Sequence, residues 1–358
     1  MVQYYWVSIP ERGGNIDHNP TKPETSPFDG SGFIDAEQTA GSFIQTELRE
    51  ETGLITMTSK TTTEPKKTEK KKHGILRAFL HILTFLLALT MIIGTAVFLY
   101  ARYTKTHYEI RFYQETSKKV SANIRIAVIS DIHNREYGEN NETLISDLRA
   151  LKPDLVLFPG DMVIRDQDDY QPVLNLVSAS AEIAPCYGVL GNHESERIYY
   201  DNDKDLPKAF EKAGLKLLRN SQEEIRIGED TVQLIGVEGT AYGFEEYGGR
   251  DFMEKRKVNP SAFCFLMAHI PTLFEPQLSG YDFDLGIAGH VHGGIVVLPF
   301  IGGLYTDEEG FFPKFTAGKY IMDKQQTLII SAGLGDSKPF PPRVNNTPEL
   351  IVIDINRY

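Results

Sequence analysis

The spacing of apolar positions divides this chain of 358 residues into distinct parts. The first part is polar and irregular, the second is almost wholly apolar, and the last alternates short apolar runs with amphipathic segments. We expect four segments: a flexible polar tail at 1–73, a transmembrane helix at 74–101, a juxtamembrane linker at 102–122 and a catalytic domain at 123–358.

The apolar segment is long enough to cross a membrane. No charged residue stands between Ile82 and Tyr100, and at 1.5 Å per residue this stretch spans roughly the 30 Å of bilayer hydrocarbon. A buried core helix is the alternative, but an apolar surface on all sides favours lipid. The segment starts too far from residue 1 for a signal peptide.

The charges that flank the apolar segment predict its orientation. Lysines gather before it, and fewer cations follow it: Lys66, Lys67, Lys70, Lys71 and Lys72 against Arg102, Lys105 and Arg111. The side richer in lysine and arginine stays in the cytoplasm. We therefore expect a single-pass membrane protein with a cytoplasmic N-terminus and an extracytoplasmic catalytic domain.

Strand and helix signals alternate in the last part. Buried strands are predicted in "NIRIAVIS", "DLVLFPG", "CYGVLG", "FCFLMA" and "DLGIAG", and helices at 141–152, 170–182 and 205–214. Residues 223–239 alternate around a Gly-Glu-Asp turn and predict a β-hairpin. The pattern indicates an α/β fold with covered sheet faces, and the hairpin indicates a second sheet stacked beside the first.

Charge and cysteine content narrow the class of protein. A net charge of -12 argues against a nucleic-acid binder, because phosphate backbones need a basic surface. The two cysteines, Cys186 and Cys264, both stand in apolar runs. We predict that they are buried free thiols.

Polar side chains follow five of the predicted strands. They are Asp131 and His133, then Asp161, then Asn192 with His193 and Glu194, then His269, and last His290 and His292. Ligands bind at the carboxyl ends of strands in open α/β sheets. Side chains at i and i+2 of an extended segment point the same way, so Asp131 and His133 should converge. Oxygen and imidazole donors together suit Mn, Fe or Zn, and the paired histidines are expected to serve one ion each.

These motifs resemble those of the calcineurin-like metallophosphoesterases. The order is D-I-H, G-D, G-N-H-E, a lone His and G-H-V-H. Five further stretches are similar to the YkuE/YaeI-like branch of this family: "VLGNHE", "AHIPTLF", "GHVHGG", "SAGLGD" and "NTPELIVIDI". That branch contains membrane-associated phosphodiesterases and relatives that cleave the pyrophosphate of a UDP-linked acylated sugar. The resemblance covers residues 123–358 and implies a four-layer α/β-β/α sandwich with two metal ions.

The resemblance also implies the role of each site residue. One metal would take Asp131, His133, Asp161 and His292, and the other Asp161, Asn192, His269 and His290, with Asp161 bridging. His193 would face the substrate as a catalytic residue. Glu194 is either an orienting group beneath the site or a surface carboxylate. Arg343 resembles an arginine of the branch and is a candidate phosphate ligand, with a surface arginine as the alternative.

The function expected from these features is a membrane-anchored, metal-dependent phosphoesterase. Its substrate would carry a phosphodiester or pyrophosphate, and a lipid-linked substrate is one option because the anchor holds the domain near headgroups. A phosphomonoesterase or phosphoprotein phosphatase is the alternative on the same metals, and a metal-stabilised binding protein is a third. Loops 236–262 and 300–320 are expected to shape the pocket.

The tail contains a second resemblance, to a degenerate Nudix box at residues 32–54. Seven of its residues are in register: Gly32, Glu47, Leu48, Glu50, Glu51, Gly53 and Leu54. Gln38 and Thr46 replace the Glu and the Arg that the box requires. A tail of this length is also shorter than a usual domain. A remnant of such a box, a chance acidic helix and a working Nudix site are the three interpretations.

Overall fold

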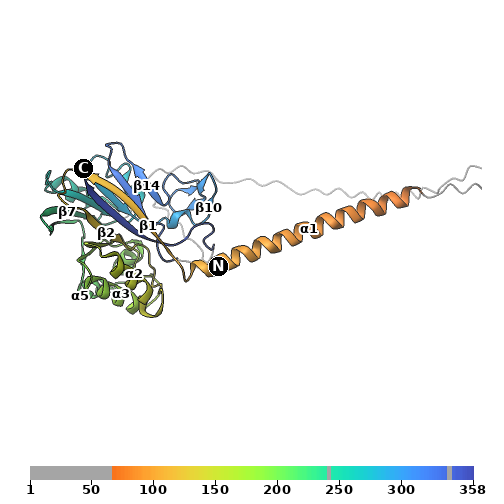
Figure 1. Ribbon diagram of the computed structural model, residues 1–358, viewed down its shortest axis with the longest axis horizontal. Coiled ribbons are helices and arrows are strands. Elements are labelled where there is room, and N and C mark those ends of the chain that lie inside the picture. The colour runs from red at the N-terminus through yellow and green to blue at the C-terminus, as the bar shows by residue number, and fades with distance from the viewer. Residues whose placement is uncertain (1–66, 240–242, 337–340) are drawn as a thin grey trace, which may run out of the picture. The chain divides into compact units, whose positions relative to one another are not determined.

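The computed structural model describes residues 67–239, 243–336 and 341–358 (Figure 1). The Nudix-like segment and the tail up to residue 66 therefore lie outside the described residues. The first described element is helix α1 (Lys67–Thr104). From His73 onward α1 is long and apolar enough to cross a membrane, and the rest of the protein buries none of its most apolar stretch.

The first sheet contains six strands in the order β1-β16-β2-β3-β4-β5. Their bounds are β1 (Glu109–Ser117), β16 (Glu349–Arg357), β2 (Ile124–Val128), β3 (Leu155–Phe158), β4 (Cys186–Gly188) and β5 (Leu215–Leu217). Strands β2 to β5 run parallel, and β16 lies antiparallel to β2. The carboxyl ends of β2, β3 and β4 therefore meet at one edge.

The segment expected to be a linker at 102–122 differs in the structure. It contains the end of α1 and strand β1, which pairs in parallel with β16 along its whole length. Half-buried side chains alternate with exposed ones in β1, as in a strand at the edge of a sheet. The polar outer face of β1 hid this strand from a search for apolar runs.

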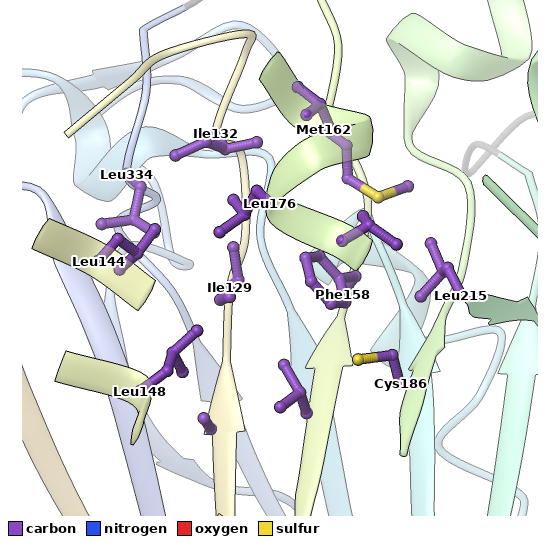
Figure 2. Close-up of a cluster of buried hydrophobic side chains, with 14 of the residues drawn as sticks. Ile129, Ile132, Leu144, Leu148, Phe158, Met162, Leu176, Cys186, Leu215 and Leu334 are labelled. Carbon is purple, nitrogen blue, oxygen red and sulfur yellow. The ribbon is translucent and has the colours of Figure 1, made fainter. Parts of the chain in front are cut away.

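Three helices cover the outer face of the first sheet (Figure 1). They are α2 (Glu142–Leu151), α3 (Gln171–Ala181) and α5 (Leu206–Ala213), each within the predicted range. Figure 2 shows Leu144 and Leu148 of α2 and Leu176 of α3 pointing at Phe158 of β3 and its neighbours. Burying each such side chain stabilises the fold by roughly 1.5–3 kcal/mol.

The second sheet also has six strands, in the order β14-β15-β9-β8-β7-β6. Their bounds are β14 (Gly318–Ile321), β15 (Thr327–Ile330), β9 (Leu285–Ala288), β8 (Phe263–Ala268), β7 (Asp230–Val237) and β6 (Ser221–Ile227). The predicted hairpin is confirmed, because β6 and β7 pair antiparallel. Strands β7, β8, β9 and β15 are parallel.

The two sheets pack face to face through a shared apolar core. Val128 and Leu157 of the first sheet belong to the same buried cluster as Phe265 and Ile287 of the second. Helix α6 (Gly249–Lys255) and the turn η2 (Pro271–Phe274) contribute to the cluster on the outer side of the second sheet. The order helix, sheet, sheet, helix confirms the predicted four-layer sandwich.

Short elements complete the fold around the strand ends. They are η1 (Glu139–Asn141), α4 (Asn192–Tyr199), η3 (His292–Gly294), β10 (Val297–Leu298), β11 (Gly302–Gly303), β12 (Tyr305–Thr306) and β13 (Gly310–Phe311). The pairs β10–β11 and β12–β13 are two small antiparallel hairpins. Strand β10 lies just before the expected pocket loop 300–320, and the other three strands lie within it. Cys186 and Cys264 are buried free thiols, as predicted.

Candidate metal centre

The candidate ligands stand just beyond the strands, in turns of unusual backbone conformation. Strand β2 ends at Val128 and β9 at Ala288, so the polar residues follow after a short gap. Asp131, Asp161 and His290 have φ angles of 49°, 51° and 72°, in the left-handed region that non-glycine residues seldom adopt. Such strain gathers at functional sites. Our i and i+2 argument from an extended strand was therefore wrong, because left-handed turns aim these side chains.

The structure brings the candidate ligands into two main groups. The donor atoms of Asp131, His133 and His292 lie within 4.8 Å of one another, and so do those of Asp161, His269 and His290. The side-chain oxygen of Asn192 is 2.8 Å from Nδ1 of His290, which places it beside the second group. His290 and His292, one residue apart, therefore stand in different groups.

Asp161 lies between the two groups. Its Oδ1 accepts the backbone N–H of His193 at 3.0 Å. Its Oδ2 is 3.2 Å from Nε2 of His269 and 3.7 Å from Nε2 of His133. One oxygen of this carboxylate is thus fixed by the backbone, and the other faces imidazoles of both groups.

His133 and His292 are neutral imidazoles whose Nε2 atoms lie only 3.2 Å apart. Burial is the main reason that the pKa of each ring is lowered to about 3, and at His292 the Arg343 guanidinium contributes to this lowering. Neutral imidazole is the form that binds metal. Two such nitrogens facing each other beside Asp131 make a set of donors that suits a cation.

His269 is held so that its outer nitrogen faces Asp161. Nδ1 donates to the carbonyl of Pro159 at 2.8 Å. Nε2 is buried and makes no hydrogen bond within the described part of the chain. Burial lowers the pKa of the ring, but the Asp161 carboxylate outweighs it and raises the pKa to about 10. The raised pKa means that Nε2 carries a proton facing Asp161. A divalent cation in place of this proton would satisfy Nε2, so the residues present fit the metal that the donor set implies.

His193 differs from the other histidines of the site. Its Nδ1 accepts the backbone N–H of Arg165 at 3.0 Å, so the proton of the neutral ring is on Nε2. Nε2 lies 4.0 Å from Oδ2 of Asp161. Its proximity to Asp161 and His133 forms a third possible donor group. A protonated Nε2 is a hydrogen-bond donor, however, and has no lone pair for a metal.

Glu194 is completely buried, so it is not a surface carboxylate. It accepts the backbone N–H groups of Asp161 and Gly191 on Oε2, at 2.9 and 2.8 Å, and that of Val163 on Oε1 at 2.8 Å. Burial and the nearby Asp161 raise the pKa of Glu194 to about 7 against these hydrogen bonds. The structure thus supports the orienting alternative, because one side chain fixes two strand ends.

Arg343 is buried, with 3% of its surface exposed, so it is not a surface arginine. Its Nε donates to Asp336 at 2.6 Å and its Nη2 to the carbonyl of Gly335 at 2.7 Å. Nη2 is also 3.2 Å from Nδ1 of His292. The guanidinium therefore packs against the ring of one candidate ligand, and its role as a phosphate ligand stays a prediction.

Two glycines of the motifs are needed for space. A Cβ atom on Gly191 would lie 2.1 Å from Oδ1 of Asp161, and one on Gly289 would lie 2.2 Å from Oδ2 of Asp131. Neither glycine has a positive φ. The reason for glycine at both positions is therefore steric, since any side chain would displace a candidate ligand.

One residue at the site, Glu308, was not predicted from the sequence. It lies in the turn between β12 and β13, with Oε1 at 3.4 Å from Nε2 of His290. His290 lowers the pKa of this carboxyl by hydrogen bonding, against the effect of burial. Nothing in "TDEEGFF" marks Glu308, because only the tertiary fold brings this turn to His290.

Comparison with known proteins agrees with this geometry. Residues 124–294 match the family model described as calcineurin-like phosphoesterase. The chain is 25% identical to the uncharacterized metallophosphoesterase YkuE of Bacillus subtilis over 72% of this chain and 88% of that protein. It is 25% identical to the phosphodiesterase YaeI of Escherichia coli over 66% and 84%, respectively. It is 27% identical to the uncharacterized metallophosphoesterase Cj0846 of Campylobacter jejuni over 76% of this chain and 71% of that protein.

The family match begins at β2 and ends with the glycines after His292. It therefore contains every histidine and aspartate of the two donor groups. A motif order read from the chain, a matching family model and a convergent set of donor atoms lead to the same conclusion. This chain belongs to the calcineurin-like metallophosphoesterase family and is a metal-dependent hydrolase of phosphoesters.

Proposed function

We propose that this protein is a membrane-anchored metallophosphoesterase that hydrolyses a phosphodiester or pyrophosphate bond with two divalent metals. The observation that carries the proposal is the position of Asp161, whose Oδ2 faces Nε2 of His269 at 3.2 Å and Nε2 of His133 at 3.7 Å. A carboxylate oxygen between two groups of imidazoles suits a bridging ligand. YaeI, which this chain matches over 84% of that protein, is named a phosphodiesterase, which favours diesters.

Each metal would have its own ligands. We assign Asp131, His133, Asp161 and His292 to one ion and Asp161, Asn192, His269 and His290 to the other. The mixture of carboxylate, amide and imidazole donors suits Mn, Fe or Zn. Two such cations, when bound, polarise a phosphoryl group and make a nucleophile of water.

His193 is the proposed catalytic residue. Because its Nδ1 accepts the N–H of Arg165, its Nε2–H points away from that bond and is available as a donor. This proton can stabilise charge that develops on a phosphoryl or leaving oxygen. Full transfer of a proton to the leaving oxygen is the alternative; it would start from an imidazolium, whose protonated Nδ1 could no longer accept the N–H of Arg165.

The anchor and the lipid-linked substrate form the finer part of the proposal. Helix α1 would cross the membrane once, with its lysine-rich start in the cytoplasm. The catalytic domain follows α1 directly, since β1 begins at Glu109, five residues after the helix ends. A domain held this close to a bilayer suits a phosphodiester or UDP-sugar headgroup attached to lipid.

The test uses the full chain in lipid nanodiscs, stripped of metal and reloaded with Mn, Fe or Zn. We would measure bound metal and the hydrolysis of a chromogenic phosphodiester and its monoester. Asp161→Asn should lose diester hydrolysis and metal, whereas Asp168→Asn, an exposed aspartate after the same strand, should retain both. Turnover of the monoester alone would favour the phosphomonoesterase or phosphoprotein phosphatase. Failure to bind metal would contradict the proposal.

A further inference from the structure

Large apolar side chains are exposed on the two small hairpins. Phe300 and Ile301, between β10 and β11, are 108% and 63% exposed. Phe311 and Phe312, at the end of β12–β13, are 69% and 63% exposed. We call these four residues the hairpin surface. Aromatic residues clustered in water are costly, and exposed apolar groups of this kind mark sites of interaction.

Some polar side chains of the same hairpins bond back to the protein. Glu309 accepts the backbone N–H groups of Lys314 and Phe315, and Thr306 is buried and accepts the N–H of Glu309. Glu308 faces His290. Asp307, Glu308 and Glu309 are nevertheless exposed residues, so the hairpins expose carboxylates as well as phenylalanines.

Two of these phenylalanines also have a strained backbone. Phe300 has a φ of 66° and Phe312 a φ of 56°. Glycine adopts this left-handed region at no steric cost, whereas a residue with a side chain is disfavoured there. Neither side chain is in the core, so the fold itself gives no reason for phenylalanine at these positions.

The base of the hairpins is joined to the end of the apolar helix. The backbone N–H of Asn346 donates to the hydroxyl of Tyr100, the last residue of the uncharged stretch, at 2.9 Å. Asn345, beside it, donates from its side chain to the carbonyl of Val297 in β10 at 3.2 Å. Two consecutive residues thus connect the point where α1 leaves its apolar span to the first hairpin.

The two hairpins share this base. The N–H of Leu304 donates to the carbonyl of Val296 at 2.8 Å, and the N–H of Phe312 donates to the carbonyl of Leu304 at 2.9 Å. Both hairpins are therefore fixed to each other and to the segment bonded to Tyr100. Tyrosine gathers at membrane interfaces, and phenylalanine is among the residues that interfacial segments bury at the boundary with the acyl chains.

We propose that the hairpin surface inserts into the interface of the same bilayer that α1 crosses. This inference rests on the proposed anchoring by α1. It goes further because it gives the catalytic domain a second contact with lipid and a defined face toward the membrane. Asn346 also donates to the carbonyl of His292 at 2.7 Å, so the docked face is tied to the candidate metal centre. The partner is a lipid surface, and the substrate class is a phosphoester that reaches the site at headgroup level.

The experiment reads lipid contact at single positions. The only tryptophan, at position 6, is replaced by Trp6→Phe, and one reporter is introduced by Ile301→Trp or Phe312→Trp in the full chain. Ile321→Trp is the matched control, because Ile321 is 60% exposed but lies on β14, outside the hairpins. Each variant is reconstituted in phosphatidylcholine nanodiscs with and without nitroxide on the acyl chains.

We expect the nitroxide to quench the hairpin reporters at least about twofold more than the control, with a blue-shifted emission. Adding Phe300→Ser to the reporter Phe312→Trp removes one buried phenyl ring and should lower the ratio of docked to undocked protein about tenfold. Quenching of the hairpin reporters no greater than that of the control would overturn the proposal. Shielding from acrylamide without nitroxide quenching would also overturn it, since a protein would then cover the surface.

The same samples separate this inference from the proposed function. Extraction with alkaline carbonate reports on α1, and turnover of the chromogenic diester reports on the metal centre. A chain that stays in the membrane and hydrolyses the diester without reporter quenching retains its proposed function and loses only the docking surface. A chain that carbonate releases loses the anchor, and the docking proposal fails with it.

Discussion

Glu194 Oε2 accepts the backbone N–H of Asp161 at 2.9 Å, so one buried carboxylate positions the turn that carries another. The two acids have opposite surroundings. The histidines around Asp161 keep its pKa well below the usual value despite burial, whereas burial and Asp161 itself raise that of Glu194. The outer carboxylate is thus the charged group that faces the candidate metal centre, and the inner one organises the backbone.

Glu194→Gln should destabilise the protein without touching a metal ligand. An amide NH₂ would replace one of the oxygens that accept backbone N–H groups, and two donors would then face each other in a buried place. We expect a loss of roughly 1–3 kcal/mol in the free energy of unfolding, measured by denaturant titration. Glu196→Gln is the control on the same helix, with its carboxylate 38% exposed beside Arg165. Equal effects of the two substitutions would contradict the orienting role.

Glu308 should act through His290 as a positioning residue. Glu308→Ala removes the acceptor beside Nε2 of His290, and loss of such a partner typically lowers metal affinity about 10- to 100-fold. Glu308→Gln keeps an oxygen at that place and should restore most of the affinity. The measurement is competition with a metal chelator. If both variants bind metal as tightly as the unmodified protein, the contact at 3.4 Å has no such role.

Arg343→Lys tests whether this arginine supports the site or binds substrate. A lysine ammonium cannot reach Asp336, Gly335 and His292 together as the planar guanidinium does. We expect lower stability, by roughly 1–3 kcal/mol, and weaker metal binding, with little change in the KM for a diester. A raised KM with unchanged stability would instead assign Arg343 to the phosphate.

The metal-free protein should lose stability as the pH rises above about 6.5. The pKa of His269 is raised from 6.5 to about 10 by Asp161, so its contribution is complete below pH 6.5 and disappears as the pH rises through 10. Below pH 6.5 the lowered pKa values of His133 and His292 oppose the raised pKa of Glu194, so the prediction applies to the upper range. Unfolding of chelator-treated protein at several pH values measures this slope. His269→Gln should flatten the upper part of the profile, and an unchanged slope would refute the assignment.

Metal binding should show the converse dependence. The cation must displace the proton from Nε2 of His269, so its apparent affinity should increase with pH over the same upper range. This outcome is measured by metal titration at several pH values. It is independent of catalysis, because it depends only on the competition between a proton and a metal.

The sequence by itself determined five buried strands, the β6–β7 hairpin, the three helices over the first sheet and the order of the polar residues at the strand ends. Apolar runs such as "DLVLFPG" can be recognised in the sequence, because a buried parallel strand needs apolar side chains on both of its faces. The motif order was sufficient to indicate the family and the metal chemistry. The apolar length of α1 was likewise evident, because span length is a property of a continuous segment.

Only the tertiary structure decided how these residues meet. The left-handed turns at Asp131, Asp161 and His290, and the contact of Glu308 with His290, arise from packing between segments far apart in the chain. Strand β1 escaped prediction because its pairing with β16, and not its own apolar pattern, makes it a strand. The burial of the Glu194 and Arg343 side chains could also not be predicted from the sequence, because burial of a charge depends on the partners that the fold brings to it.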